Sequence, residues 1–271
     1  MANGDRWCVV RGGGDIATGA VWRLRRAGYR VVVTELASPL TIRRTVAVSS
    51  AVTESGFSVE GMRAELAASP NDVHHIHERG SVPVIVAPML ADLGSSIDFG
   101  TVVDARLAKR PLDTSINDAD LVVALGPGFI AGRDCHAVVE TNRGHRLGRV
   151  IWEGAAEPDT GTPGLIEGRG AERVLRAPID GVIQWSAGIG ERVSGGSTIG
   201  RIVQHDLTET IKAPFDGVLR GAILDRSPVR SGTKIADVDP RIDDRAWREI
   251  SDKALAVGGG VVEAVAARGP M

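Results

Sequence analysis

Short apolar runs recur along the first half of the chain, and each is followed by a turn marked by glycine or proline and then by a stretch with helical spacing. The apolar residues in each run are continuous rather than alternating, which is typical of strands covered on both faces. Between the first two runs, small and apolar residues repeat at helical spacing up to a C-cap at Gly28. The pattern predicts an α/β domain with a parallel sheet over residues 1–152. The predicted strands are Trp7–Arg11, Arg30–Thr34, Val82–Ala87, Thr101–Ala105, Leu121–Leu125 and Ala137–Glu140, and Thr45–Ser69 is interpreted as an inserted hairpin and helix.

The pattern changes after residue 152. Residues 153–174 are rich in proline and glycine and are interpreted as a linker. Over residues 175–239, short alternating runs form an internal repeat: Arg176–Val182 is echoed by Lys212–Val218, and Val193–Ile199 by Val229–Ile235, both with an offset of 36 residues. The repeat predicts a small all-β domain made of two intertwined halves.

This repeat resembles the barrel-sandwich fold of biotinyl and lipoyl carrier domains. In that family an "APxDG" sequence opens the second half, and a lysine on the preceding hairpin carries the cofactor. The corresponding hairpin here is Gln204–Thr208, and Asp206 stands about where the lysine is expected. The missing lysine disfavours a carrier role and favours a docking or scaffolding module.

Residues 240–271 predict two helices that pack back on the α/β domain. Apolar residues recur at helical spacing over Ile242–Val257, and a shorter alanine-rich stretch covers Val261–Ala267. The glycines at positions 258–260 are expected to separate the two helices.

A glycine-rich loop follows the first predicted strand and opens the first predicted helix. Gly12, Gly14 and Ala17 match the G-x-G-x-x-A spacing of a dinucleotide-binding fingerprint. Glu35 lies 21 residues after Gly14, close to the distance of about 20 expected for an acid that binds a ribose. The loop therefore predicts a Rossmann-like domain in which the backbone of Gly12, Gly13 and Gly14 binds phosphate.

Asp15 fits this fingerprint least well. A carboxylate at a helix N-terminus is stabilised by the helix dipole and by the first backbone N–H groups, so Asp15 is interpreted as an N-cap. The alternative is a ligand role, in which Asp15 competes with a pyrophosphate or brings a divalent cation such as Mg²⁺ to it.

Two further loops follow predicted strands, at the edge where open α/β sheets bind their ligands. The small residues of Leu125–Gly132 allow a ligand or a second backbone segment to approach closely. Glu140–His145 carries five hydrogen-bonding side chains within six residues, which favours a polar, anionic ligand. The candidate site residues in these loops are Gly126, Gly128, Thr141, Arg143 and His145.

Composition and charge argue against two classes of binding partner, nucleic acids and membranes. The 32 lysines and arginines against 34 acidic residues give a net charge of −2, so no general field attracts nucleic acid or an anionic membrane. No uncharged stretch approaches the roughly 20 apolar residues of a membrane span. The first residues also lack the apolar region of a secretory signal. The chain is therefore expected to be cytoplasmic and to bind neither nucleic acid nor membrane.

Patterns for metal binding or covalent catalysis are weak. His74, His75 and His77 do not have the spacing that places two ligands on one helical face, so no metal is predicted. Cys8 and Cys135 form no disulfide framework. Because no Ser-His-Asp, paired-carboxylate or Walker-type pattern is present, no residue is assigned a catalytic role.

Several segments taken together resemble the YqeB-like family. They are the glycine loop "RGGGDIATG" and the downstream segments "DARLAK", "ALGPGFIAG" and "ETNRGHRLGRV". This family is described as accessory proteins of selenium-dependent molybdenum hydroxylase systems, and xanthine dehydrogenase accessory factors are a looser comparison. The resemblance implies a maturation factor that partners a molybdenum hydroxylase subunit. It also implies a molybdopterin-type or nucleotide cofactor, with or without Mg²⁺, at the glycine loop.

Two alternatives stay open. An NAD(P)-dependent oxidoreductase is compatible with the glycine loop and Glu35, although no catalytic Tyr-Lys pair is visible and Tyr29 is the one tyrosine of the sequence. A non-catalytic scaffold that binds a hydroxylase subunit through the β-domain is the other alternative. The sequence leaves a homo-oligomer open as well.

Overall fold

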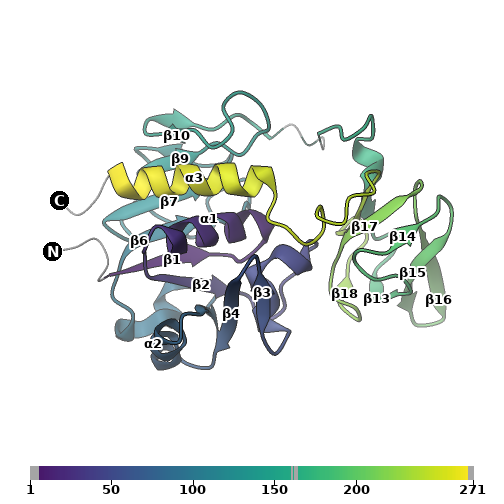
Figure 1. Ribbon diagram of the computed structural model, residues 1–271, viewed down its shortest axis with the longest axis horizontal. Helices are drawn as coiled ribbons and strands as arrows, with labels where there is room; N and C mark the ends of the chain where they lie inside the picture. The colour runs from purple at the N-terminus through teal and green to yellow at the C-terminus, as the bar shows by residue number, and fades with distance from the viewer. Residues whose placement is uncertain (1–5, 160, 162–163, 268–271) are drawn as a thin grey trace. The chain divides into compact units, whose positions relative to one another are not determined.

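The computed structural model describes residues 6–159, 161 and 164–267 (Figure 1), and the chain divides into two compact units. Unit 1 comprises Met1–Pro39, Ala47–Asp159 and Ile250–Met271. Unit 2 comprises Leu40–Val46 and Thr160–Glu249. Of the predicted domains, residues 1–5, 160, 162–163 and 268–271 lie outside the described residues. Both units are thus assembled from segments that are separated along the chain.

Unit 1 contains a nine-stranded sheet with the order β10-β9-β7-β6-β1-β2-β5-β4-β3. Seven neighbouring strands, from β9 to β4, run parallel, and β3 and β10 are antiparallel at the two edges. The strands are β1 (Trp7–Arg11), β2 (Val31–Glu35), β3 (Phe57–Val59), β4 (Met62–Ala67), β5 (Val82–Val86), β6 (Phe99–Asp104), β7 (Leu121–Leu125), β9 (Ala137–Val139) and β10 (Val150–Ile151). A separate pair consists of β8 (Ile130–Ala131) and β11 (Gly154–Ala155).

The prediction of a parallel sheet was therefore wrong at both edges, and the sheet is mixed. At one edge, Glu60 and Gly61 join β3 to β4 with φ values of 44° and 76°. A two-residue turn with positive φ at both positions connects antiparallel strands, because its twist matches that of a hairpin. The segment Thr45–Ser69 thus forms the expected hairpin, but its helical part is only a 3₁₀ turn, η2 (Val48–Val52).

Two α-helices follow strands of the sheet. The helix α1 (Asp15–Arg26) turns a continuous small and apolar face inward. The helix α2 (Pro70–Glu78) begins after Ser69, whose hydroxyl accepts the N–H of Asp72 at 3.3 Å, and it packs against β4 and β5. A 3₁₀ segment, η3 (Leu90–Ser96), precedes β6. The buried residues of α1 are Ile16, Ala17, Thr18, Gly19, Ala20, Val21 and Leu24.

The C-terminal segment corrects the prediction of two helices. A single helix, α3 (Asp252–Ala267), runs through the glycines at 258–260, and the preceding residues 240–249 belong to unit 2. The helix lies beside α1 (Figure 1). A Cβ atom on Gly258 would stand 2.4 Å from the carbonyl oxygen of Gly19 in α1, so only glycine permits this approach. Close packing therefore offsets the helix propensity that the glycines lack.

Unit 2 consists of two four-stranded antiparallel sheets. One sheet has the order β12 (Val174–Arg176), β19 (Lys234–Asp239), β17 (Gly217–Ala222), β14 (Arg192–Val193). The other has the order β16 (Leu207–Lys212), β15 (Thr198–Gln204), β13 (Gly181–Trp185), β18 (Pro228–Val229). Their shared core is mostly aliphatic and includes Ile183, Ile199, Ile202, Leu219, Ile223 and Ile235.

The internal repeat has a direct structural counterpart in unit 2. The carboxylate of Asp180 accepts the N–H of Ser231 at 2.8 Å, and that of Asp216 accepts the N–H of Gly195 at 2.7 Å. Asp180 and Asp216 are equivalent in the repeat, as are Gly195 and Ser231, so each half holds a turn of the other.

Unit 2 also includes the segment Leu40–Val46, which ends in η1 (Arg44–Val46). The guanidinium of Arg44 donates to the carbonyl oxygen of Ala222 at 2.9 Å, and Gly221 leaves room for the backbone of Ile42. The predicted linker, residues 153–174, is not one uniform connection either. Gly154–Ala155 forms β11 in unit 1, and η4 (Ala171–Arg173) belongs to unit 2.

Candidate functional site

The strand order of unit 1 places a reversal between β1 and β6. From β1 the chain passes to β2 and β5 on one side, and it later returns to β6, β7 and β9 on the other. In open α/β sheets, ligands bind outside the carboxyl ends of the strands at such a reversal. Arg11 and Asp104, the last residues of β1 and β6, are paired in register at this point.

The reversal itself is filled by the side chains of the protein. Asp104 is 1% exposed and accepts hydrogen bonds from the guanidinium of Arg106 at 2.6 Å and the hydroxyl of Thr114 at 2.7 Å. Arg11, also 1% exposed, donates to Thr114 at 2.7 Å and to Asp113 at 2.6 Å. Arg106 donates to Asp113 as well, at 2.6 Å. Two arginines and two aspartates thus balance one another in a network at the point where the strand order reverses.

The first two glycines of the loop accommodate other parts of the protein. Gly12 has a φ of 88°, and a Cβ on it would lie 3.2 Å from Cγ of Arg106. A Cβ on Gly13 would lie 2.8 Å from the nitrogen of Ser49, whose N–H donates to the carbonyl oxygen of Gly13 at 2.9 Å. The N–H of Gly13 donates to Glu35 at 2.7 Å, so this carboxylate holds the loop. These contacts give Gly12, Gly13 and Glu35 structural roles.

Gly14 differs from its neighbours. It is the N-cap residue of α1, with extended backbone and no side chain, and no heavy atom lies within 4 Å of a Cβ placed on it. The interpretation of Asp15 as the N-cap was therefore wrong by one position, since Asp15 is the first residue of the helix. The N-terminus of α1 is therefore the open part of the glycine loop.

The loops after β7 and β9 pack tightly. A Cβ on Gly126 would lie 2.5 Å from the hydroxyl oxygen of the buried Thr141, and one on Gly128 would lie 2.2 Å from the carbonyl carbon of Lys109. Glu140 is fully buried, and its carboxylate accepts the N–H groups of Asn142 at 2.7 Å and Glu157 at 2.8 Å. Gly126, Gly128 and Thr141 thus shape the loops, and Glu140 fixes their conformation.

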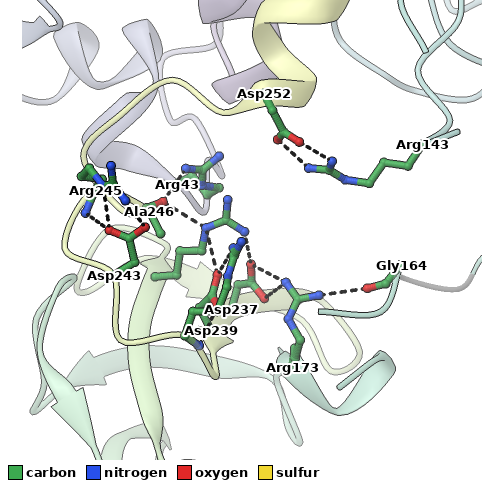
Figure 2. A network of polar contacts seen from close by, with 12 residues as sticks. Arg43, Arg143, Gly164, Arg173, Asp237, Asp239, Asp243, Arg245, Ala246 and Asp252 are labelled. Carbon is green, nitrogen blue, oxygen red and sulfur yellow. Dashed lines mark hydrogen bonds and ion pairs between the residues drawn. The ribbon is translucent and has the colours of Figure 1, made fainter. Parts of the chain in front are cut away.

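Arg143 and His145 lie further out on the loop that follows β9. Arg143 forms a two-fold ion pair with Asp252 in the first turn of α3, with distances of 2.7 and 2.9 Å (Figure 2). The imidazole of His145 is exposed and forms no hydrogen bond or ion pair with the described part of the chain.

Lys253 is the residue that the sequence analysis missed. It lies in the first turn of α3 and is half-buried. Burial lowers the pKa of Lys253, and the nearby Arg143 lowers this pKa further, whereas Asp15, Glu140 and Asp252 act in the opposite direction. Within residues 6–159, 161 and 164–267, no hydrogen bond or ion pair engages its ammonium group. The one signal in the sequence is the position of Lys253 directly before a run of small and apolar residues, "ALAVGGGVV".

The structure thus brings part of the predicted site together and leaves part of it elsewhere. Asp15, Glu140, Arg143, Asp252 and Lys253 interact electrostatically around the N-termini of α1 and α3. In the described part of the chain, no group of three or more histidine, cysteine or acidic residues is arranged to hold a metal ion. No helix in that part has the length and apolar character needed to cross a membrane.

Comparison with known proteins gives one sequence relative. No family model matches the chain. The chain is 45% identical over 263 residues to YqeB of Escherichia coli (strain K12), a protein described as uncharacterized. The match covers 97% of this chain and 48% of that protein, so the chain spans about half the length of the curated relative. This similarity supports the resemblance to YqeB-like proteins, and it adds nothing about selenium or molybdenum.

Solved structures with similarity to the chain are remote. An aspartoacylase family protein from Mesorhizobium loti is 10% identical with a TM-score of 0.29, and the match covers 87% of this chain and 84% of that chain. The ectoine utilization protein EutE from Ruegeria pomeroyi is 11% identical with a TM-score of 0.27, covering 87% and 85%. A succinylglutamate desuccinylase/aspartoacylase from Rhodobacter sphaeroides is 12% identical with a TM-score of 0.26, covering 79% and 59%.

These comparisons correct the predicted fold names and functions. The structural neighbours carry aspartoacylase, desuccinylase and ectoine utilization names, and none of the comparisons supports a Rossmann-like or a barrel-sandwich-like fold. The mixed sheet and the paired four-stranded sheets described above replace those two fold names. None of the comparisons supports a molybdenum hydroxylase maturation factor, an NAD(P)-dependent oxidoreductase or a hydroxylase-binding scaffold, and these three predicted functions are withdrawn. TM-scores this low carry no activity from those proteins to this chain.

Proposed function

We propose that unit 1 binds a small molecule through a phosphate group, at the carboxyl edge of its sheet beside the N-termini of α1 and α3. The observation that carries this proposal is the ammonium group of Lys253, which is half-buried and has no hydrogen-bond partner among the described residues. A lysine in that state loses hydration without gaining an ion pair, so an anionic ligand would stabilise its charged form.

Two helix N-termini support the same ligand class. The first N–H groups of α1 follow the open Gly14, and no side chain caps this helix. In α3 the hydroxyl of Ser251 already accepts the N–H of Ala254 at 3.2 Å, so α3 contributes mainly its dipole. Asp15 and Lys253, in the first turns of the two helices, interact electrostatically. Free N–H groups and helix dipoles at an N-terminus favour phosphate.

The acidic residues nearby are compatible with such a ligand. Asp252 is paired with Arg143, and Glu140 accepts two backbone N–H groups, so both carboxylates are already engaged. Asp15 adds a further negative charge at the site. A Mg²⁺ ion bound with the phosphate would offset this charge, and a nucleotide is the predicted class of phosphate compound.

The experiment is a thermal unfolding titration of the full chain with inorganic phosphate, pyrophosphate and ATP, each with and without Mg²⁺, at constant ionic strength. A ligand of the folded state raises the stability by about 2.7 kcal/mol at 100 times its Kd. Lys253→Met is expected to weaken binding roughly tenfold or more, because one charge-assisted hydrogen bond contributes about 1.5–3 kcal/mol. Asp15→Asn is expected to reduce the dependence on Mg²⁺.

Lys212→Met is the matched control, because Lys212 is an exposed lysine in unit 2. It should bind the probes as the unchanged protein does. The proposal would be overturned by the absence of any saturable shift, or by equal affinities in the Lys253→Met and Lys212→Met proteins.

A further inference from the structure

A cluster of arginines and aspartates lies within unit 2, on β17, β19 and the segments beside them. Asp237 and Asp239 on β19 are 5% and 1% exposed. Three arginines, Arg173, Arg220 and Arg241, form ion pairs with these two carboxylates. Arg43 acts electrostatically on Arg220, and Figure 2 shows part of the network.

Each carboxylate has one close arginine partner. Arg173 lies 3.2 Å from Asp237, and Arg241 lies 2.7 Å from Asp239. Glu167 and Asp243 act electrostatically on Arg241 as well, and Asp243 also pairs with Arg245 at 3.1 Å. Arg173 and Arg241 are therefore the arginines that neutralise the two buried aspartates.

Arg220 has the weakest pairing with the two carboxylates, because no hydrogen bond joins it to either of them. Its nitrogens lie 3.8 Å from Asp237 and 3.6 Å from Asp239, which are too long for hydrogen bonds. Its Nε donates to the carbonyl oxygen of Ala246 at 3.1 Å, and no other hydrogen bond of this side chain is formed with the described residues. The side chain is only 11% exposed.

A second guanidinium approaches the same carbonyl group. Arg43 donates from Nη2 to the oxygen of Ala246 at 2.9 Å, so two cations converge on one neutral acceptor. Burial lowers the pKa of Arg220 to about 10, and the charge of Arg43 contributes to this change. A desolvated guanidinium group repelled by a second cation is stabilised when an oxyanion accepts its N–H groups, and Arg220 is the group in that position.

We propose that Arg220 is the centre of an oxyanion-binding site in unit 2, which takes a phosphate or carboxylate group on its Nη atoms. The planar guanidinium presents two parallel N–H donors, which match the oxygens of either group. The site is separate from the Lys253 site of unit 1 and does not depend on the function proposed for it.

The test uses the full chain with Lys253→Met as background, so that phosphate binding in unit 1 is weakened. Isothermal titration with inorganic phosphate and, separately, acetate is expected to show saturable binding of at least one of them. Adding Arg220→Gln is expected to weaken that binding roughly tenfold or more. Adding Arg201→Gln, at an exposed arginine of β15, should leave it unchanged. The preferred anion identifies the ligand group.

Arg220→Gln is expected to fold, because Asp237 and Asp239 both keep their closer arginine. If it does not fold, Arg220→Lys serves as the second variant, since it keeps the charge but loses the planar pair of donors. The proposal is overturned if neither anion binds in the Lys253→Met background. It is also overturned if the folded Arg220 variant binds as tightly as the Arg201 variant.

Discussion

The backbones of Gly19 and Gly258 are in direct contact where α1 and α3 lie side by side. A Cβ on Gly19 would lie 2.2 Å from the carbonyl oxygen of Ala254, and one on Gly258 would lie 2.4 Å from that of Gly19. Gly259, the next residue of α3, has no heavy atom within 4 Å of its Cβ position. Adjacent glycines in one helix therefore have opposite tolerance for a side chain.

This contrast predicts opposite effects of two alanine substitutions. Gly258→Ala is expected to lower the free energy of unfolding by about 1–3 kcal/mol, because the new methyl group pushes the helices apart. Gly259→Ala is expected to raise it by about 0.5–1 kcal/mol, because alanine has the better helix propensity and no contact is disturbed. Urea unfolding of both variants measures these changes. Equal effects of the two substitutions would contradict the close packing of α1 and α3.

The sequence pattern located most strands of the sheet but not its edges. The predicted strands Trp7–Arg11 and Leu121–Leu125 are confirmed with the same bounds, because continuous apolar runs between turns are strong local signals. The short edge strand β10 escaped prediction, and β3 was expected only as part of a hairpin without strand bounds. The three glycines of α3 were read as a break, since helix propensity contains no information about a partner helix.

The candidate site was predictable only in part, for a related reason. The glycine loop and Arg143 were visible because they follow strands directly, in segments dense with small or polar residues. Lys253 is separated by more than 230 residues from Asp15, which acts on it electrostatically. Without knowing that α3 returns to α1, the sequence offers no reason to connect these two side chains.

The buried network at the reversal of the sheet predicts a large loss of stability on removal of one charge. Asp104→Asn leaves Arg11 and Arg106 with Asp113 as the remaining carboxylate of the network. Breaking a buried ion pair by removing one partner costs about 3–5 kcal/mol. Urea unfolding should show a loss of this size.

The control for Asp104→Asn is Asp206→Asn in the exposed turn between β15 and β16. This change should alter the free energy of unfolding by less than about 0.5 kcal/mol. A loss below about 1 kcal/mol for Asp104→Asn would show that the network contributes little to stability.

A histidine near the opposite edge of the sheet predicts a dependence of stability on pH. Nδ1 of His77 lies 2.9 Å from the guanidinium of Arg25, which has only donors, so this nitrogen must be an unprotonated acceptor. Burial lowers the pKa of His77, and the charges of Arg25 and Arg30 lower it further. The folded protein therefore holds fewer protons at this site than the unfolded chain.

For a group with a lowered pKa in the folded state, the stabilisation is complete above the unfolded value, here 6.5, and is lost as the pH falls through the folded value. The free energy of unfolding should decrease as the pH falls below 6.5, because the unfolded chain then binds a proton that the folded protein does not. His77→Gln should flatten this slope, whereas His145→Gln, at an exposed position, should leave it unchanged. Equal slopes in the two variants would exclude His77 as the source.

The interruption of unit 1 by unit 2 along the chain sets an order for folding during synthesis. Because α3 follows unit 2 along the chain, the glycine backbone of α1 that α3 contacts cannot be covered until all of Leu40–Glu249 has left the ribosome. The strands of unit 2 are complete before then, and Leu40–Val46 has been available since early in translation. Unit 2 can therefore complete its fold before unit 1 does.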